Sequence, residues 1–241
     1  AMIGRRRDRL EGTAEQVEGL GRNAVVEAGD VADAEALDRL FASVEKAFDG
    51  ANAIQGLVLV NNAGVPGDVR ALHRQQTDRD PAGAPDFRQT VRIHLAPWEL
   101  TQRAAKLTKE RGVPLTVVNI LTRFATLERT EDVPYPFRLP YTIAQAVKAT
   151  IGEGLAWELA DQNVSVINIA FGPAAGERIE TVVYPLGAWE RQAHGIQISA
   201  EQIRQQTADL HPGKRFVELT DVADSVVFAT SPSGRRLGTG E

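Results

Sequence analysis

Short apolar runs alternate along this chain with longer stretches of helical periodicity. Four of the runs have the length and composition of buried strands, at residues 24–27, 54–60, 114–121 and 164–170. The stretches between them carry apolar residues at spacings of three and four, as amphipathic helices do. Strands that alternate with helices predict a mostly parallel sheet with helices on both faces, which is a doubly wound α/β fold.

The helical stretches also show where they begin and end. Asp33 is placed to cap a helix that Gly50 ends. Segments 86–109 and 142–160 are long enough for two further helices, and the second repeats Ile, Val or Leu every four positions. A shorter helix is expected at 222–229, with Thr220 or Asp221 as its cap, although its Val-Val-Phe run also fits a strand.

Three segments interrupt this alternation, at 65–85, 122–140 and 173–213. Each follows the carboxyl end of a predicted strand. Ligands of open α/β sheets bind at that edge, and loops there commonly carry function. We therefore expect these three irregular segments to surround a binding site.

Composition narrows the class of protein. The 241 residues are 43% hydrophobic, enough for one domain spanning 1–241. A net charge of -5 argues against a nucleic-acid partner, and the absence of cysteine excludes disulfides and a thiolate nucleophile. Four scattered histidines argue against a metal site. Without an apolar run of roughly 20 residues or a secretory signal, we expect a cytoplasmic protein with no membrane contact.

Four short motifs, taken in order, carry a family resemblance. They are Asn61-Asn62-Ala63-Gly64, Val117-Val118-Asn119-Ile120, Tyr141 ahead of a helix, and Asn168-Ile169-Ala170-Phe171-Gly172-Pro173. Their order and spacing resemble those of short-chain dehydrogenases/reductases, over nearly the whole chain. The resemblance implies a Rossmann-like sheet. The Val133-Pro134-Tyr135-Pro136 segment, and Glu177-Arg178-Ile179 after Gly172-Pro173, are most similar to the dehydrogenase modules of bifunctional malonyl-CoA reductases.

The resemblance implies a catalytic tyrosine, and Tyr141 stands in its place. In the family this tyrosine protonates a carbonyl while a nicotinamide delivers hydride, and a lysine four residues later lowers the tyrosine pKa. Here that position holds the uncharged Gln145. Lys148 lies seven residues beyond Tyr141, about 10.5 Å along a helix, and is either a substitute cation or a solvated surface lysine.

Two further catalytic positions depart from the family. Thr122 follows the strand where the family has a serine, and it is either a hydroxyl donor or a plain strand-end residue. The family's helix asparagine falls among Arg92, Ile93 and His94, so His94 is either a proton relay or a structural histidine.

For the cofactor, the resemblance implies NADP(H). Arg5 or Arg6 either pairs with the 2′-phosphate or belongs to a solvated basic turn. The remaining implied contacts are Asp30 and Val31 beside the adenine, and Asn62, Ala63, Gly64 and Gly172. The family's first strand and its glycine-rich phosphate turn have no counterpart in this sequence, which makes cofactor binding doubtful. That strand is central in the order 3-2-1-4-5-6, so we expect a gap in the sheet.

These departures leave competing hypotheses. The losses favour a protein with impaired hydride transfer that serves as a scaffold or partner subunit, forming a homo-oligomer through helices 86–109 and 142–160. The alternative is an NADP(H)-dependent oxidoreductase that reduces a small carbonyl or acyl-derived aldehyde substrate. A third is a non-redox enzyme that keeps Tyr141 as an acid.

Overall fold

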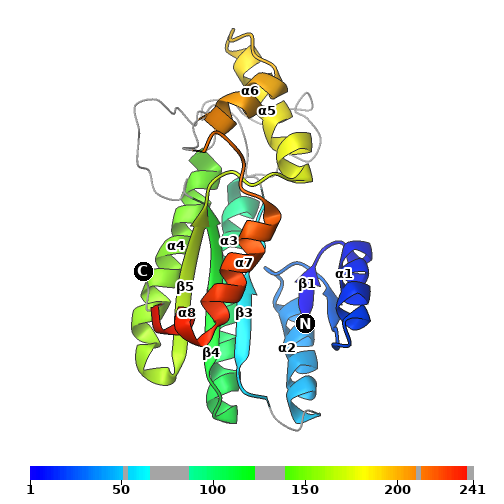
Figure 1. Cartoon of the computed structure of the whole chain (residues 1–241), viewed down its shortest axis with the longest axis vertical. Coiled ribbons are helices and arrows are strands. Elements are labelled where there is room, and N and C mark those ends of the chain that lie inside the picture. Colours follow the sequence, from blue (N-terminus) through cyan, green and yellow to red (C-terminus); the bar gives the residue numbers. More distant parts are fainter. Residues whose placement is uncertain (51–53, 66–86, 123–138, 210–212, 238–241) are drawn as a thin grey trace.

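The computed structural model describes residues 1–50, 54–65, 87–122, 139–209 and 213–237 (Figure 1). The segment Val133-Pro134-Tyr135-Pro136 and most of the irregular segments 65–85 and 122–140 lie outside the described residues. Within these ranges the chain forms parallel strands with helices packed on both faces, so the predicted α/β architecture is confirmed.

The strands form two separate parallel sheets. β1 (Met2–Gly4) pairs with β2 (Val26–Ala28), whereas β3 (Leu57–Asn61), β4 (Leu115–Thr122) and β5 (Val164–Phe171) form a second sheet in that order. Among the described residues no hydrogen-bonded ladder joins β1 to β3. The break lies where the sequence predicts the family's first strand to be missing, so the expected gap is present.

Two long helices cover one face of the three-stranded sheet. α3 (Phe87–Arg111) packs against α4 (Leu139–Glu158), and both contact the strands. Buried side chains from α3, α4 and the strands share one apolar core with α2 (Ala34–Asp49). α2 is capped by Asp33 and ended by Gly50, as the sequence predicts. A short helical turn, η2 (Ala160–Gln162), connects α4 to β5.

The opposite face of this sheet packs against α7 (Leu219–Thr230), which leads into α8 (Pro232–Leu237). Ala229 of α7 meets Val118 and Ile167 of the strands in a second apolar cluster. The helical interpretation of this segment is confirmed, but its predicted cap is wrong. Glu218 is the N-cap residue. Together with Asp221, three residues later, it forms a capping box, in which the side chain of each residue accepts a hydrogen bond from the backbone amide of the other.

Residues 173–213 were expected to be irregular, and that prediction is wrong. They form η3 (Ile179–Val183), α5 (Tyr184–Ala193) and α6 (Ala200–Asp209) above the carboxyl ends of β3 to β5 (Figure 1). We call η3, α5 and α6 the cap. Its helices pack around a small cluster of Tyr184, Ala188, Ile203, Ala208 and Phe216. The buried residues of α5 include Gly187 and Glu190, which do not count as apolar positions, so the helical periodicity of the sequence is hard to detect there. The predicted position over the edge is confirmed.

The two-stranded sheet carries α1 (Arg7–Gly19), a helix that the sequence analysis did not predict. None of the residues of α1 is buried, so the helix has no apolar stripe that would identify it.

Candidate active site

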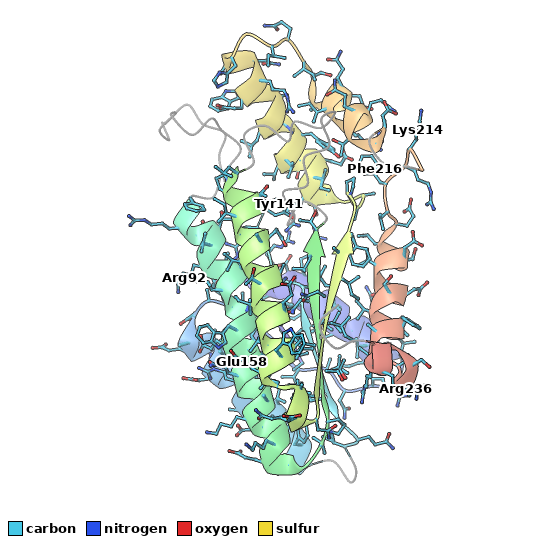
Figure 2. All side chains as sticks on the ribbon, turned by 90° about the vertical axis from the view of Figure 1, so that its left-hand side faces the viewer. Arg92, Tyr141, Glu158, Lys214, Phe216 and Arg236 are labelled. Carbon is cyan, nitrogen blue, oxygen red and sulfur yellow. The ribbon has the colours of Figure 1, made fainter. Side chains whose placement is uncertain are left out.

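Tyr141 lies in the first turn of α4, at the end of the helix that faces the cap. Figure 2 shows it there, with Glu158 at the far end of the same helix. Its ring meets the ring of His94 edge to face, with centroids 6.2 Å apart. The structure therefore brings together two residues that the sequence placed 47 positions apart and proposed separately for catalysis.

His94 of α3 is fully buried and is held in one tautomer. Its Nδ1 lies 2.7 Å from the carbonyl oxygen of Thr90, which only accepts, so Nδ1 carries the proton. Nε2 is then an acceptor and lies 3.1 Å from Nε2 of Gln145, which donates to it. Burial lowers the pKa of His94 to about 4, and the nearby positive charges of Lys148 and Arg178 add to this effect. His94 is a neutral acceptor at physiological pH.

Gln145 is the last residue in this chain of hydrogen bonds, and its side-chain oxygen is available to a further donor. Its side chain is only 6% exposed, and its Oε1 has no hydrogen-bond partner among the described residues. Because Nε2 already donates to His94, the open atom is an acceptor. A buried carboxamide oxygen without a partner costs about 1–3 kcal/mol, so the site is suited to a ligand hydroxyl or another donor.

Lys148 corrects one sequence interpretation. It is not a solvated surface lysine, since it is 1% exposed. Its Nζ donates to the carbonyl oxygens of Asn61, at 2.6 Å, and Ile120, at 2.9 Å. Burial lowers its pKa from 10.5 to about 7, with a smaller contribution from the positive charge of Arg178. A helical side chain points toward the helix N-terminus, which lets Lys148 reach the carboxyl ends of β3 and β4.

The turn Asn61-Asn62-Ala63-Gly64 follows β3 and lies against this cluster. A Cβ added to Gly64 would lie 3.6 Å from Nε2 of His94, so the turn packs directly on the imidazole. At its other side, the carbonyl of Gly64 accepts a 2.9 Å hydrogen bond from Arg178. Both ends of the turn are therefore held by cationic side chains.

Beneath the cluster, three asparagines bond side by side across the sheet. Asn61 donates to Asn119 at 2.8 Å, Asn119 donates to Asn168 at 2.9 Å, and Asn168 donates to the carbonyl of Ala149 on α4. The three are paired in register, so the row is perpendicular to the strands. Gly152 of α4 sits on the row, where a Cβ would come 2.2 Å from Oδ1 of Asn168.

The other predicted site residues lie at the same carboxyl edges of the strands. Thr122 ends β4 and Gly172 follows β5. Arg5 and Arg6 follow β1 and are exposed, while Asp30 and Val31 follow β2. Val31 is buried, and Oδ1 of Asp30 accepts from the amide of Ala32. No contact joins these β1 and β2 residues to the Tyr141 cluster in the described chain, and their cofactor roles stay predictions.

Sequence reasoning missed two contributors to this site. Arg178 was quoted only as part of a family motif, and no spacing rule connects it to a turn 114 residues earlier. The asparagine row had a detectable signal, since Asn61, Asn119 and Asn168 each stand near the end of a predicted strand. Neighbouring parallel strands bring such positions together.

The described residues contain no group of three or more His, Asp or Glu side chains that could hold a metal ion. Within the same ranges, every helix is too short or too polar to cross a bilayer.

Comparisons with known proteins agree with this geometry. The family model described as short chain dehydrogenase matches residues 1–182. An NAD+-bound xylitol dehydrogenase superposes with a TM-score of 0.76 at 18% identity, covering 98% of this chain and 84% of the other. L-sorbose reductase from Gluconobacter frateurii, complexed with NADPH and L-sorbose, gives 0.73 at 22%, covering 97% and 80%. An actinorhodin polyketide ketoreductase with NADPH gives 0.73 at 21%, covering 98% and 82%. No curated protein sequence matches the chain.

Proposed function

Because this chain belongs to the short-chain dehydrogenase family, we propose that it is a nicotinamide-dependent oxidoreductase that reduces a carbonyl group of a small molecule. The observation that carries this proposal is the contact of Tyr141 with a neutral His94, which accepts a hydrogen bond from Gln145 and lies near the charges of Lys148 and Arg178. The comparisons give no support to a loss of activity. They favour oxidoreduction over the scaffold hypothesis, because solved structures of this fold hold NAD+ or NADPH.

The residues near Tyr141 fit the nicotinamide end of such a cofactor. Oε1 of Gln145 is a buried acceptor that lacks a partner in the part of the chain that the structure describes, and it is suited to a ribose hydroxyl. Asn62, Ala63 and Gly64 border the same space, and Arg5 or Arg6 supplies the charge for a 2′-phosphate. The bound cofactor supplies the hydride. NADP(H) is our proposal for the specific cofactor.

In this proposal Tyr141 donates its hydroxyl proton to the carbonyl oxygen of the substrate. The family has a lysine where this chain has Gln145. In its place, we propose that the positive charges of Lys148 and Arg178 act on Tyr141 from a greater distance. Lys148 and Arg178 both lower the pKa of His94, which shows that their charges act on the ring packed against Tyr141. The same field favours the oxyanion that develops on the substrate and the phenolate that Tyr141 becomes.

For the substrate, we propose a small hydroxylated carbonyl compound or an acyl-derived aldehyde. The first class is suggested by solved relatives of this fold named for xylitol, L-sorbose and a polyketide. The second follows from the resemblance to malonyl-CoA reductase modules. We place the protein in the cytoplasm.

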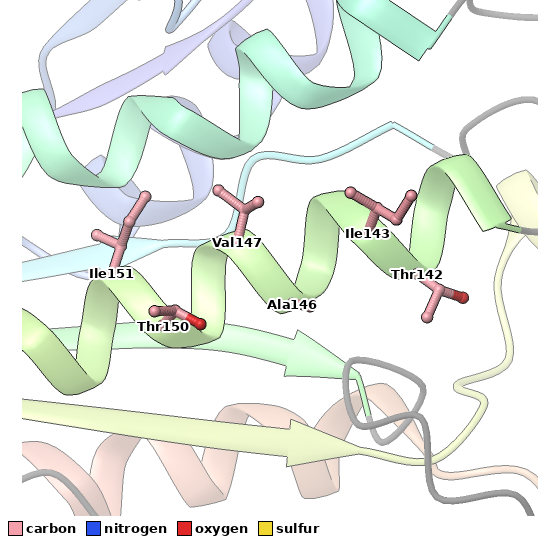
Figure 3. A pocket seen from close by; sticks show the side chains of 6 residues that line it. All are labelled: Thr142, Ile143, Ala146, Val147, Thr150 and Ile151. Atoms are coloured by element: carbon pink, nitrogen blue, oxygen red, sulfur yellow. The ribbon is translucent and has the colours of Figure 1, made fainter.

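A partner-subunit role remains a second candidate for one reason, the apolar outer surface of α3 and α4. Leu95, Trp98, Ile143 and Trp157 are exposed there, Trp157 by 83%. Figure 3 shows an apolar groove along α4, lined by Thr142, Ile143, Ala146, Val147, Thr150 and Ile151. We propose that two copies of the chain associate through this surface. Analytical ultracentrifugation should show a dimer that Trp157→Glu dissociates, and a monomeric wild type would contradict the proposal.

The oxidoreductase proposal is tested by titrating the protein with NADPH and following the fluorescence of its three tryptophans. We expect saturable binding, and turnover of a carbonyl substrate that Tyr141→Phe lowers by at least about 100-fold while NADPH still binds. Absence of binding at millimolar NADPH would overturn the oxidoreductase and leave the partner-subunit role.

A further inference from the structure

Two cationic side chains hold the turn Asn61-Asn62-Ala63-Gly64 from opposite ends. Nζ of Lys148 donates to the first carbonyl of the turn, that of Asn61, at 2.6 Å. A guanidinium nitrogen of Arg178 donates to the last carbonyl, that of Gly64, at 2.9 Å. Charged donors make hydrogen bonds roughly twice as strong as neutral ones.

The two cations come from different layers of the molecule. Lys148 lies on α4, beneath the sheet edge, and its second bond to Ile120 ties β3 to β4. Arg178 directly precedes η3, the first element of the cap. The turn is therefore the place where the cap and the sheet are joined by charged hydrogen bonds.

The cap also has internal connections of its own. Glu180 of η3 pairs with Arg204 of α6 at 3.0 Å, and the Arg204 guanidinium lies over the ring of Phe216. Two backbone bonds between Val217 and the chain at Pro173 and Ala175 close its base. Arg178 thus connects the cap to Gly64 of the turn.

We propose that Lys148 and Arg178 are positioning residues, which together fix the 61–64 turn against His94 and couple its geometry to the position of the cap. Neither residue needs to touch a substrate to do this. Only one consequence of this inference rests on the proposed function, namely that a change in the turn alters cofactor binding.

In the part of the chain that the structure describes, no carboxylate pairs with either cation. Lys148 donates there to two backbone carbonyls, and Arg178 donates to the carbonyl of Gly64. Loss of Arg178 would release the Gly64 end of the turn, because that carbonyl accepts no other hydrogen bond among the described residues.

The test is hydrogen–deuterium exchange of residues 57–65 in the full chain. We expect about tenfold faster exchange in Arg178→Gln, because a hydrogen bond from a charged donor is lost, and a similar or larger increase in Lys148→Met. Arg235→Gln is the matched control, since Arg235 also donates to a backbone carbonyl, that of Thr230, but on α8. Exchange of 57–65 should be unchanged in this control. Arg178→Lys keeps the charge and should recover part of the protection.

A second readout separates positioning from general stability. In Arg178→Gln the Kd for NADPH should rise about tenfold while the urea midpoint of unfolding stays close to that of the wild type. Unchanged exchange in Arg178→Gln, or equal acceleration across the whole chain, would overturn the inference even if Lys148→Met fails to fold. If the wild type binds no NADPH, the proposed function fails, and the exchange comparison still decides whether the turn is held by these cations.

Discussion

The two sheets of this protein are built differently. The β3-β4-β5 sheet carries a row of three asparagines, two of them buried, and it packs against a buried lysine and a buried histidine–glutamine pair of α3 and α4. The β1-β2 sheet has strands of three residues, a helix α1 without one buried residue, and an exposed ion pair between Arg39 and Glu27 at 2.8 Å. Substitutions around the β3-β4-β5 sheet should therefore change the free energy of unfolding. Substitutions in the β1-β2 sheet should change ligand affinity alone.

The largest contrast is expected in the pH dependence of stability. Burial lowers the pKa of Lys148 to about 7 in the folded protein, from 10.5. Between these values the unfolded chain binds more protons, so the free energy of unfolding rises as pH increases from 7 to about 10, and no further change comes from Lys148 below pH 7. The rise should total roughly 3–5 kcal/mol. Urea titrations at several pH values measure it.

Lys148→Met is the control for this prediction. It lacks the titrating group, so its stability should vary much less over the same range. An equal rise in both proteins would show that other groups cause the effect and that Lys148 is more solvated than its contacts indicate.

The second contrast concerns two glycines on the same helix. In Gly152→Ala the new Cβ would lie 2.2 Å from Oδ1 of Asn168 and 2.6 Å from Nδ2 of Asn119, so the asparagine row must break or α4 must shift. We expect a loss of about 2–4 kcal/mol. Gly154→Ala meets no atom within 4 Å and should gain about 0.5–1 kcal/mol from helix propensity. Denaturant unfolding of both variants would contradict the role of the row if they behaved alike.

A smaller effect is expected when the family lysine is restored. Gln145→Lys adds a cation next to His94, where Lys148 and Arg178 already contribute positive charge. We expect a loss of about 2 kcal/mol at pH 7, with no gain in turnover. The double variant Gln145→Lys, Lys148→Gln moves the cation by one turn and should recover about half of the loss. Increased turnover in the single variant would show instead that the glutamine limits the chemistry.

The contrast also explains what the sequence could predict. Periodicity and the end signals at Asp33 and Gly50 located α2, and the family motifs located Tyr141 and the turn at 61–64. The gap in the sheet followed from strand order. Lys148 was misjudged because helical spacing says which residues share a face but not how far a long side chain reaches back. Arg178 was missed because its bond to Gly64 depends on how the cap folds over the sheet.

The smallest effect on stability is expected in the β1-β2 sheet. Arg5 and Arg6 are exposed after β1, so Arg5→Ser and Arg6→Ser should change the free energy of unfolding by less than about 0.5 kcal/mol. If either pairs with a 2′-phosphate, its loss should weaken NADPH binding about tenfold and leave NADH binding unchanged.

Arg7→Ser is the matched control, because Arg7 belongs to the same basic run but is paired with Glu11 on α1 at 3.4 Å. A change in NADPH affinity that is equal in all three variants would mean that the basic run acts only through its total charge. A change confined to Arg5 or Arg6 would show that this sheet, although weakly packed, recognises the cofactor by a specific contact.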